Sequence, residues 1–67
     1  MSILKVIEVL GSSGTSWEDA AQKMVSEAGK TVKNIRSLYV QEMSAKVENN
    51  KITEYRINGK VTFEIAS

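Results

Sequence analysis

The strongest constraint on the fold is a strict alternation of apolar and polar residues near the end of the chain. Between Glu54 and Ile65 an apolar residue stands at every second position, interrupted only by Gly59. A period of two predicts a β-strand with one buried face and one face in water. The apolar members of this strand are Tyr55, Ile57, Val61, Phe63 and Ile65.

A second segment of the same period precedes this strand. From Ile35 to Val47 apolar and polar residues again alternate, with Leu38 and Val40 among the apolar ones. The polar run 48–51 that follows contains the pair Asn49-Asn50, and tight hairpin turns favour such a pair. The two segments therefore predict a long antiparallel hairpin.

The first half of the chain predicts a strand followed by a helix. Ile3–Leu10 is short and rich in β-branched and aliphatic residues, which is typical of a strand. The small polar residues of Gly11–Ser16 predict a break. Apolar residues then recur at spacings of three and four, which predicts an amphipathic helix over about residues 15–33. Its apolar face comprises Trp17, Ala20, Ala21, Met24, Val25, Ala28 and Val32.

The predicted helix has recognisable signals at both ends. Ser13 or Thr15 is suited to the N-cap, and Thr15 with Glu18 fits a capping box. Asn34 is suited to the exit because Asn tolerates a left-handed backbone. The order strand, helix, hairpin makes the chain α+β with a β-α-β-β arrangement.

The size of the chain predicts self-association. Its 67 residues form a single domain, 1–67, whose own core is small. Cys and His are absent from the sequence, so neither disulfides nor thiolate or imidazole zinc sites can compensate. A helix over residues 15–33 is about 28 Å long, whereas hairpin strands of about 14 residues reach about 45 Å. One helix cannot cover such a hairpin, so we expect copies of the chain to cover the rest.

The charge pattern argues against nucleic acid as a partner. Lys and Arg total 9 and Asp and Glu total 8, and both signs are spread along the chain. The apolar run at the start is interrupted by Lys5 and Glu8, well short of a membrane-spanning or signal segment. We expect no membrane partner and a cytoplasmic location.

Few residues are candidates for catalysis or ligand binding, and nothing in the sequence supports catalysis. Trp17 lies on the apolar stripe and is interpreted as a core residue. The stretch 11–14 sits between strand and helix but lacks the Lys-Ser/Thr ending of a phosphate-binding loop. Without His, no paired acid and base can be singled out. Carboxylates could bind a cation where symmetry repeats them around an axis, and the candidates are Glu42, Glu48, Glu54 and Glu64.

The whole arrangement resembles a dodecin over nearly the full chain. The resemblance implies a β-α-β-β subunit whose three-stranded antiparallel sheet partly wraps one helix. It also implies a homododecamer, a hollow shell with cubic symmetry. The residues that carry it are Lys5–Val9, Gly11–Ser13, Thr15–Ala21, Glu54–Ile57 and Lys60–Ile65.

The resemblance implies non-enzymatic binding or storage of a small ligand, with riboflavin or FMN as the family's typical cofactors. A Trp that stacks on the flavin and a Gln that bonds its polar edge carry the family's site. By position these fall on Ser37 and Arg56, and both differ. Arg56 can still donate to a carbonyl or phosphate, and Tyr39 is a candidate substitute ring.

The alternative is a calcium-binding or purely structural dodecin assembly with a vestigial flavin pocket. Some dodecin-like proteins lack the stacking Trp and carry Ile-Arg in the place of Ile35-Arg36. Part of that branch is associated with calcium. The sequence does not identify the metal ligands.

Overall fold

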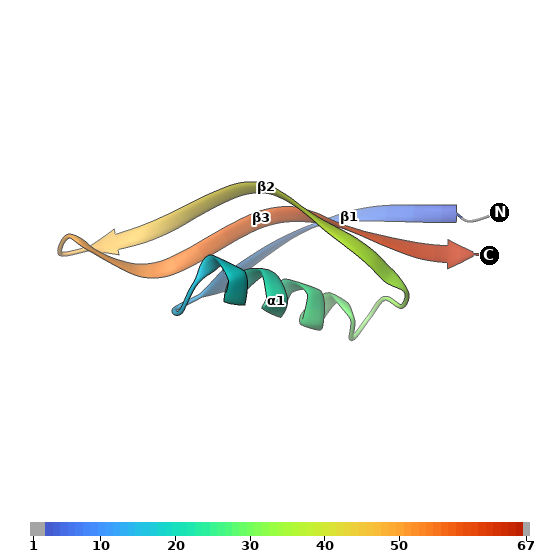
Figure 1. Ribbon diagram of the computed structural model, residues 1–67, viewed down its shortest axis with the longest axis horizontal. Helices are drawn as coiled ribbons and strands as arrows, with labels where there is room; N and C mark the ends of the chain where they lie inside the picture. The colour runs from blue at the N-terminus through green and yellow to red at the C-terminus, as the bar shows by residue number, and fades with distance from the viewer. Residues whose placement is uncertain (1–2, 67) are drawn as a thin grey trace.

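The computed structural model describes residues 3–66, which form three strands and one helix (Figure 1). Strand β1 spans Ile3–Ser13 and helix α1 spans Trp17–Ala28. Strands β2 (Ile35–Glu48) and β3 (Lys51–Ala66) form the hairpin. The predicted β-α-β-β order is confirmed.

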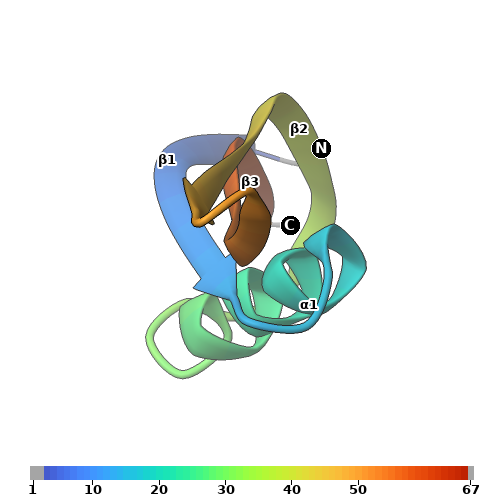
Figure 2. The ribbon, with the colours of Figure 1, turned by 90° about the vertical axis from the view of Figure 1, so that its left-hand side faces the viewer.

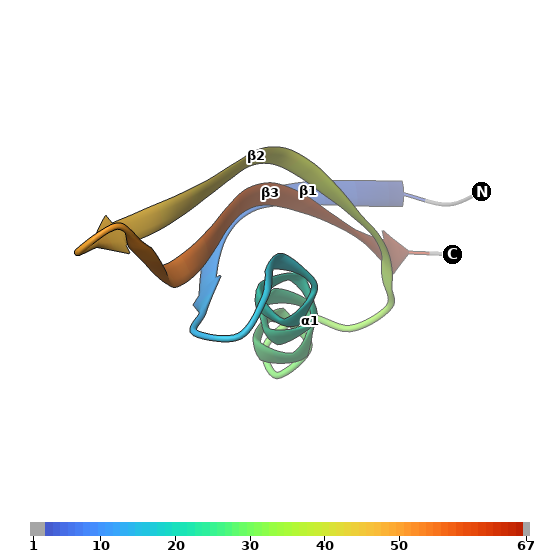
Figure 3. The same cartoon turned by 60° about the vertical axis from the view of Figure 1, so that its left-hand side comes forward.

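The three strands form one antiparallel sheet in the order β1-β3-β2. β3 is therefore the central strand, and β1 and β2 are both edges. The sheet arches over α1, which lies against one face only (Figure 3). Viewed end-on, the strands curve around the helix, so the sheet partly wraps it as predicted (Figure 2).

The helix is shorter than the sequence predicts, and its N-cap is a different residue. Ser16 caps it, with an extended backbone and a hydroxyl that accepts a 2.9 Å hydrogen bond from the backbone N–H of Asp19. The predicted N-cap candidates Ser13 and Thr15 are therefore wrong. The Ser13 hydroxyl instead donates to the Asp19 carboxylate at 2.6 Å.

The end of the helix also differs from the prediction, although the exit residue is as expected. The last helical residue is Ala28, and the segment to Val32 continues as turns closed by hydrogen bonds to the Ala28 carbonyl. Asn34 has φ 61°, the left-handed conformation expected there. The lysines of this segment therefore lie beyond the helix, whose last turn contains no basic residue.

The core lies between α1 and the face of β3 that the alternation predicts to be buried. Ile57, Val61 and Phe63 are all buried. The helix contributes one side of the core through Ala20, Met24 and Ala28. Val9, Trp17, Ala21 and Leu38 pack around it, partly buried.

Gly11 belongs to β1 and allows the helix to approach the sheet. A Cβ at this position would lie 2.1 Å from Cγ of Met24 and 3.2 Å from the backbone oxygen of Ala20. The predicted break at 11–13 is therefore wrong, since these residues continue β1 opposite Ile57, Arg56 and Tyr55. A residue without a side chain is needed here so that the helix can pack against the sheet, not to form a turn.

The hairpin turn is as the sequence predicts. Asn49 and Asn50 have φ values of 53° and 64°, as a two-residue turn with left-handed central residues requires. The hairpin then extends past the start of α1, at the far left in Figure 1.

Both ends of the sheet expose apolar side chains, as the length comparison predicts. The molecule measures 52 × 19 × 14 Å, whereas a helix of 12 residues is about 18 Å long. The exposed apolar residues of the hairpin include Val40, Met43, Val47 and Ile52. Those of β1 and the end of β3 are Ile3, Leu4, Val6, Leu10 and Ile65.

Candidate functional site

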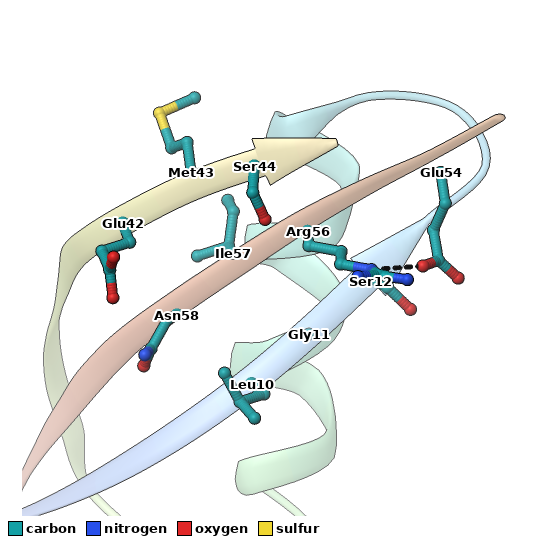
Figure 4. A pocket seen from close by; sticks show the side chains of 10 residues that line it. All are labelled: Leu10, Gly11, Ser12, Glu42, Met43, Ser44, Glu54, Arg56, Ile57 and Asn58. Atoms are coloured by element: carbon teal, nitrogen blue, oxygen red, sulfur yellow. Dashed lines mark hydrogen bonds and ion pairs between the residues drawn. The ribbon is translucent and has the colours of Figure 1, made fainter. Parts of the chain in front are cut away.

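A groove crosses the sheet on the side away from the helix. Its volume is about 540 Å³, and all three strands contribute to it (Figure 4). We call it the outer-face groove. Its lining residues are Leu10, Gly11 and Ser12 of β1, Glu42, Met43 and Ser44 of β2, and Glu54, Arg56, Ile57 and Asn58 of β3.

Arg56 is the only one of the flavin-site candidates Ser37, Tyr39 and Arg56 that lies in this groove, and two of the candidate carboxylates, Glu42 and Glu54, lie there with it. Arg56 sits on the central strand with Ser12 and Ser44 as its neighbours on the two edge strands. Its Nε donates to Oε1 of Glu54 at 2.5 Å, and 52% of the Arg56 side chain stays exposed. The ion pair with Glu54 orients the guanidinium while leaving it accessible.

The other end of the groove is built on the row Leu10, Asn58 and Glu42. The Asn58 Oδ1 atom is buried and accepts no hydrogen bond from the described residues. The Glu42 carboxylate makes no ion pair within residues 3–66. The groove therefore has a guanidinium toward one end and an uncompensated carboxylate toward the other.

Ser37 and Tyr39 lie elsewhere on the sheet. Ser37 is opposite Thr62 and Tyr39 is opposite Lys60, both exposed positions on β2. Thr62 is six residues from Arg56 along β3, a separation of about 20 Å. One chain therefore does not bring Ser37 and Arg56 together, and a site that uses both needs a second copy.

Tyr39 does offer an accessible aromatic ring, since 63% of the residue is exposed. Its cross-strand neighbour Lys60 is also exposed. The predicted substitute ring is thus available on the surface, whereas the hydroxyl of Ser37 provides no stacking face.

The acidic candidates for metal binding are dispersed. Within residues 3–66 no three Asp or Glu side chains cluster as a cation site would require. Glu48 pairs with Lys46, and Glu64 pairs with Arg36 at 2.6 Å. Together with Glu54, these carboxylates already contact cationic side chains in the single chain.

Trp17 connects the helix to the strands that line the groove. Its indole N–H donates to the backbone oxygen of Ser44 at 3.0 Å. Its ring meets Tyr55 edge-on, with centroids 4.8 Å apart. The packing role expected for Trp17 is confirmed at the margin of the core, and the hydrogen bond to Ser44 adds a contact that periodicity does not reveal.

The start of the helix holds a network of polar side chains. The Ser13 hydroxyl accepts from the backbone N–H of Thr15 at 2.9 Å while donating to Asp19. This hydrogen bond, followed by the Lys23 ammonium, lowers the pKa of the Asp19 carboxyl below its ordinary value. The network accounts for the polar residues that precede the helix.

The groove residues that were not identified as ligand candidates from the sequence include Ser12, Ser44, Asn58 and Leu10. Each occupies an outward-facing position of a strand, and the alternation could have marked that face. Only the register of the strands places them beside Arg56.

The structure also bears on whether the helix could span a membrane. In the part of the chain that is described, the single helix is too short and too polar to cross a bilayer.

Comparisons with known proteins agree with the resemblance seen in the sequence. The family model described as Dodecin matches residues 3–66. A protein named calcium dodecin, from Mycobacterium tuberculosis, is 40% identical over 65 residues, which is 97% of this chain and 92% of that protein.

Solved structures show the same fold. The crystal structure of the Mycobacterium tuberculosis calcium dodecin, described as having a novel calcium-binding site, has a TM-score of 0.82 and 41% identity over 97% of this chain and 93% of its own. A variant of the Thermus thermophilus dodecin has a TM-score of 0.93 at 24% identity, with both chains fully covered. The dodecin from Streptomyces davaonensis has a TM-score of 0.92 at 20% identity, with coverage of 98% and 97%. The chain belongs to the dodecin family.

Proposed function

We propose that this protein is a non-enzymatic ligand-binding assembly, a hollow shell of twelve identical subunits. The exposed apolar residues at both ends of the sheet support association, since the single helix leaves them uncovered. Burial of apolar surface is worth about 25 cal/mol per Å², so contacts between copies supply stability that a core this small lacks.

We infer further that the ligand is Ca²⁺. The observation that carries this is the 40% identity, across 97% of the chain, to a protein named calcium dodecin. Two features of the chain agree. Ser37 stands where the family's stacking ring is expected, and Glu42 is a carboxylate without an ion pair in the described chain. Ca²⁺ takes six to eight oxygen ligands, so carboxylates of several subunits must converge.

The second candidate is a flavin, riboflavin or FMN, bound between copies. The exposed ring of Tyr39 favours it, because that ring could stack in place of the missing indole. Arg56 of another subunit would then donate to a carbonyl or phosphate of the ligand. Stacking of one ring contributes about 1–3 kcal/mol, so the affinity depends largely on Tyr39.

Thermal melting and riboflavin fluorescence decide between Ca²⁺ and the flavin. Protein stripped with chelator should gain several degrees in melting temperature on addition of Ca²⁺, and should lose them again with excess chelator. Mg²⁺ is the matched control, because its smaller octahedral shell suits a different site. Added riboflavin should keep its fluorescence.

Two results would contradict the proposal. An unchanged melting temperature with Ca²⁺ rejects the calcium function, and quenching of riboflavin that is lost in Tyr39→Ser establishes the flavin candidate in its place. Light scattering after size-exclusion chromatography tests the assembly, and a folded monomer would reject the shell.

A further inference from the structure

We propose that β1 is the strand through which two copies of the chain join their sheets. The free edges of two β1 strands pair antiparallel about a two-fold axis, so that two three-stranded sheets become one continuous sheet. This inference rests on the proposed assembly and specifies one contact within it. It is supported by the difference between the two sheet edges, by the side chains of β1 and by the position of the helix.

The two edges of the sheet differ in regularity. β1 pairs with β3 without interruption from Leu4 to Ser13, and its other edge faces no strand of the described chain. The pairing of β2 is interrupted three times, and its longest regular run is Glu42–Lys46. Bulges protect an edge from further pairing, whereas a long regular edge exposes a row of unpaired N–H and C=O groups. A further strand can therefore be added at β1, and among copies of this chain the equally regular partner is another β1.

The side chains of β1 suit a contact between copies. Leu4, Val6 and Leu10 lie on the face away from the helix, because they alternate with Ile7, whose partner on β3 is the buried Val61. All three are more than half exposed in the single chain. A long, exposed, hydrophobic edge strand is a site of association. Pairing with a second copy would cover these side chains from the side of the strand.

Helix α1 leaves the first part of β1 accessible. The strand begins beyond the end of the helix and approaches it only toward Gly11 (Figure 1). Beside that second part runs a groove of about 390 Å³, lined by Val9–Ser12 of β1 and, from the helix, by Lys23 and Glu27 among others. Because these charged side chains border the strand there, we place the pairing on Leu4–Leu10.

The charges on β1 restrict the register of the pair. Residues opposite each other in a sheet share a face, so the two-fold axis must pass through one residue of β1. An axis at Lys5 or Glu8 would set two like charges directly opposite each other, which destabilises a sheet. An axis at Val6 would pair only residues 4–8.

An axis at Ile7 satisfies both conditions and uses the whole segment 4–10. It sets Ile7 opposite Ile7 of the second copy on the helix face. On the other face it sets Leu4 opposite Leu10 of the second copy, and Leu10 opposite Leu4. These apolar pairs are the contacts that the experiment addresses.

Disulfide trapping tests the register, because the sequence contains no Cys. Residues directly opposite in an antiparallel pair have Cα atoms about 4.5–5.5 Å apart, which a disulfide can bridge. In the double variant Leu4→Cys/Leu10→Cys, mild oxidation of the assembled protein should link chains into dimers and no further on a non-reducing denaturing gel. The two positions are about 20 Å apart within one chain and cannot bond to each other there. Leu4→Cys and Leu10→Cys alone should give no dimers.

Leu4→Cys/Ser12→Cys is the matched control. It keeps one thiol and moves the other by a two-residue step on the same face, so it should give no dimers. Dimers from a single variant or from this control would overturn the proposal. So would the absence of dimers from Leu4→Cys/Leu10→Cys in a particle that light scattering shows to be assembled. A monomer in light scattering would reject the assembly and this contact with it, so the two failures are distinguishable.

Hydrogen exchange of the unaltered assembly gives a second readout. In an antiparallel pair every second residue directs its backbone N–H away from its partner, so about half of the β1 amides have no strand partner in a single copy. Pairing with the second copy bonds those of residues 4–10. Mass spectrometry of the assembled protein should therefore show all amides of this segment exchanging at least about 10-fold more slowly than those of an unpaired strand edge. Fast exchange at half of them in the assembled particle would overturn the proposal.

Discussion

Replacing Gly11 by Ala should destabilise the subunit through one identifiable contact. The added Cβ would lie 2.1 Å from Cγ and 2.9 Å from Sδ of Met24, and 3.2 Å from the backbone oxygen of Ala20. The Met24 side chain is 4% exposed and sits in the core, so it has little room to move aside. Overpacking of this kind costs about 1–3 kcal/mol.

The nearby Gly14 provides the matched control. A Cβ there would meet no heavy atom within 4 Å, and φ of Gly14 is not positive. Gly14→Ala should therefore leave stability unchanged or raise it by about 0.4–1 kcal/mol, since Ala restricts the unfolded chain. The two substitutions add the same methyl group three residues apart, so their difference isolates the contact with the helix.

The assay is thermal and urea unfolding at one fixed subunit concentration, because association contributes to the apparent stability. For a domain of this size, 1 kcal/mol corresponds to about 4–8 °C in melting temperature. A double variant with Met24→Ala separates the causes: once Met24 is truncated, adding Gly11→Ala should cost much less than it does alone. If Gly11→Ala is as stable as Gly14→Ala, the packing argument for β1 and α1 is refuted.

Three further predictions concern single contacts. Trp17→Phe should keep the packing but lose the hydrogen bond to Ser44, lowering stability by about 0.5–1.5 kcal/mol in urea unfolding, and an unchanged midpoint would show that this bond contributes nothing. The hydrogen bond from Ser13 lowers the pKa of Asp19 in the folded state, so the ionised carboxylate contributes to the free energy of unfolding above the ordinary pKa of 3.8, and this contribution is lost as pH falls through the folded value. Asp19→Asn should therefore flatten the acid side of a plot of melting temperature against pH. An acid side as steep as before would count against that linkage. At φ 64°, Asn50→Gly should be tolerated and Asn50→Ala should cost about 1 kcal/mol, an order that equal midpoints would disprove.

The fold could be predicted largely from the periodicity of apolar residues, because the buried face of a strand is set by the local sequence. Ile57, Val61 and Phe63 are buried as the alternation predicts. The extent of β1 did not follow in the same way. Gly11 has the composition of a turn, and only its contact with Met24 explains a glycine within a strand.

The candidate site could be predicted from the sequence to a much smaller extent, because it depends on strand register. The turn pairs Glu48 with Lys51, and unbroken pairing from there would place Ser44 opposite Tyr55. A shift between Lys46 and Val47 places Ser44 opposite Arg56 instead, and a second shift after Val40 restores the first register. A slip of one residue turns side chains to the other face, and the sequence carries no clear mark of it.

The position of β3 in the middle of the sheet constrains how the chain can be made. β1 and β2 are synthesised before β3, yet each pairs only with β3. While the nascent polypeptide still lacks β3, two edge strands and an amphipathic helix have emerged without the partner that aligns them. Both strand pairings, β1 with β3 and β2 with β3, form only when β3 leaves the ribosome. Folding of the protomer is therefore a late, cooperative event, and subunit docking is delayed until translation has passed this strand.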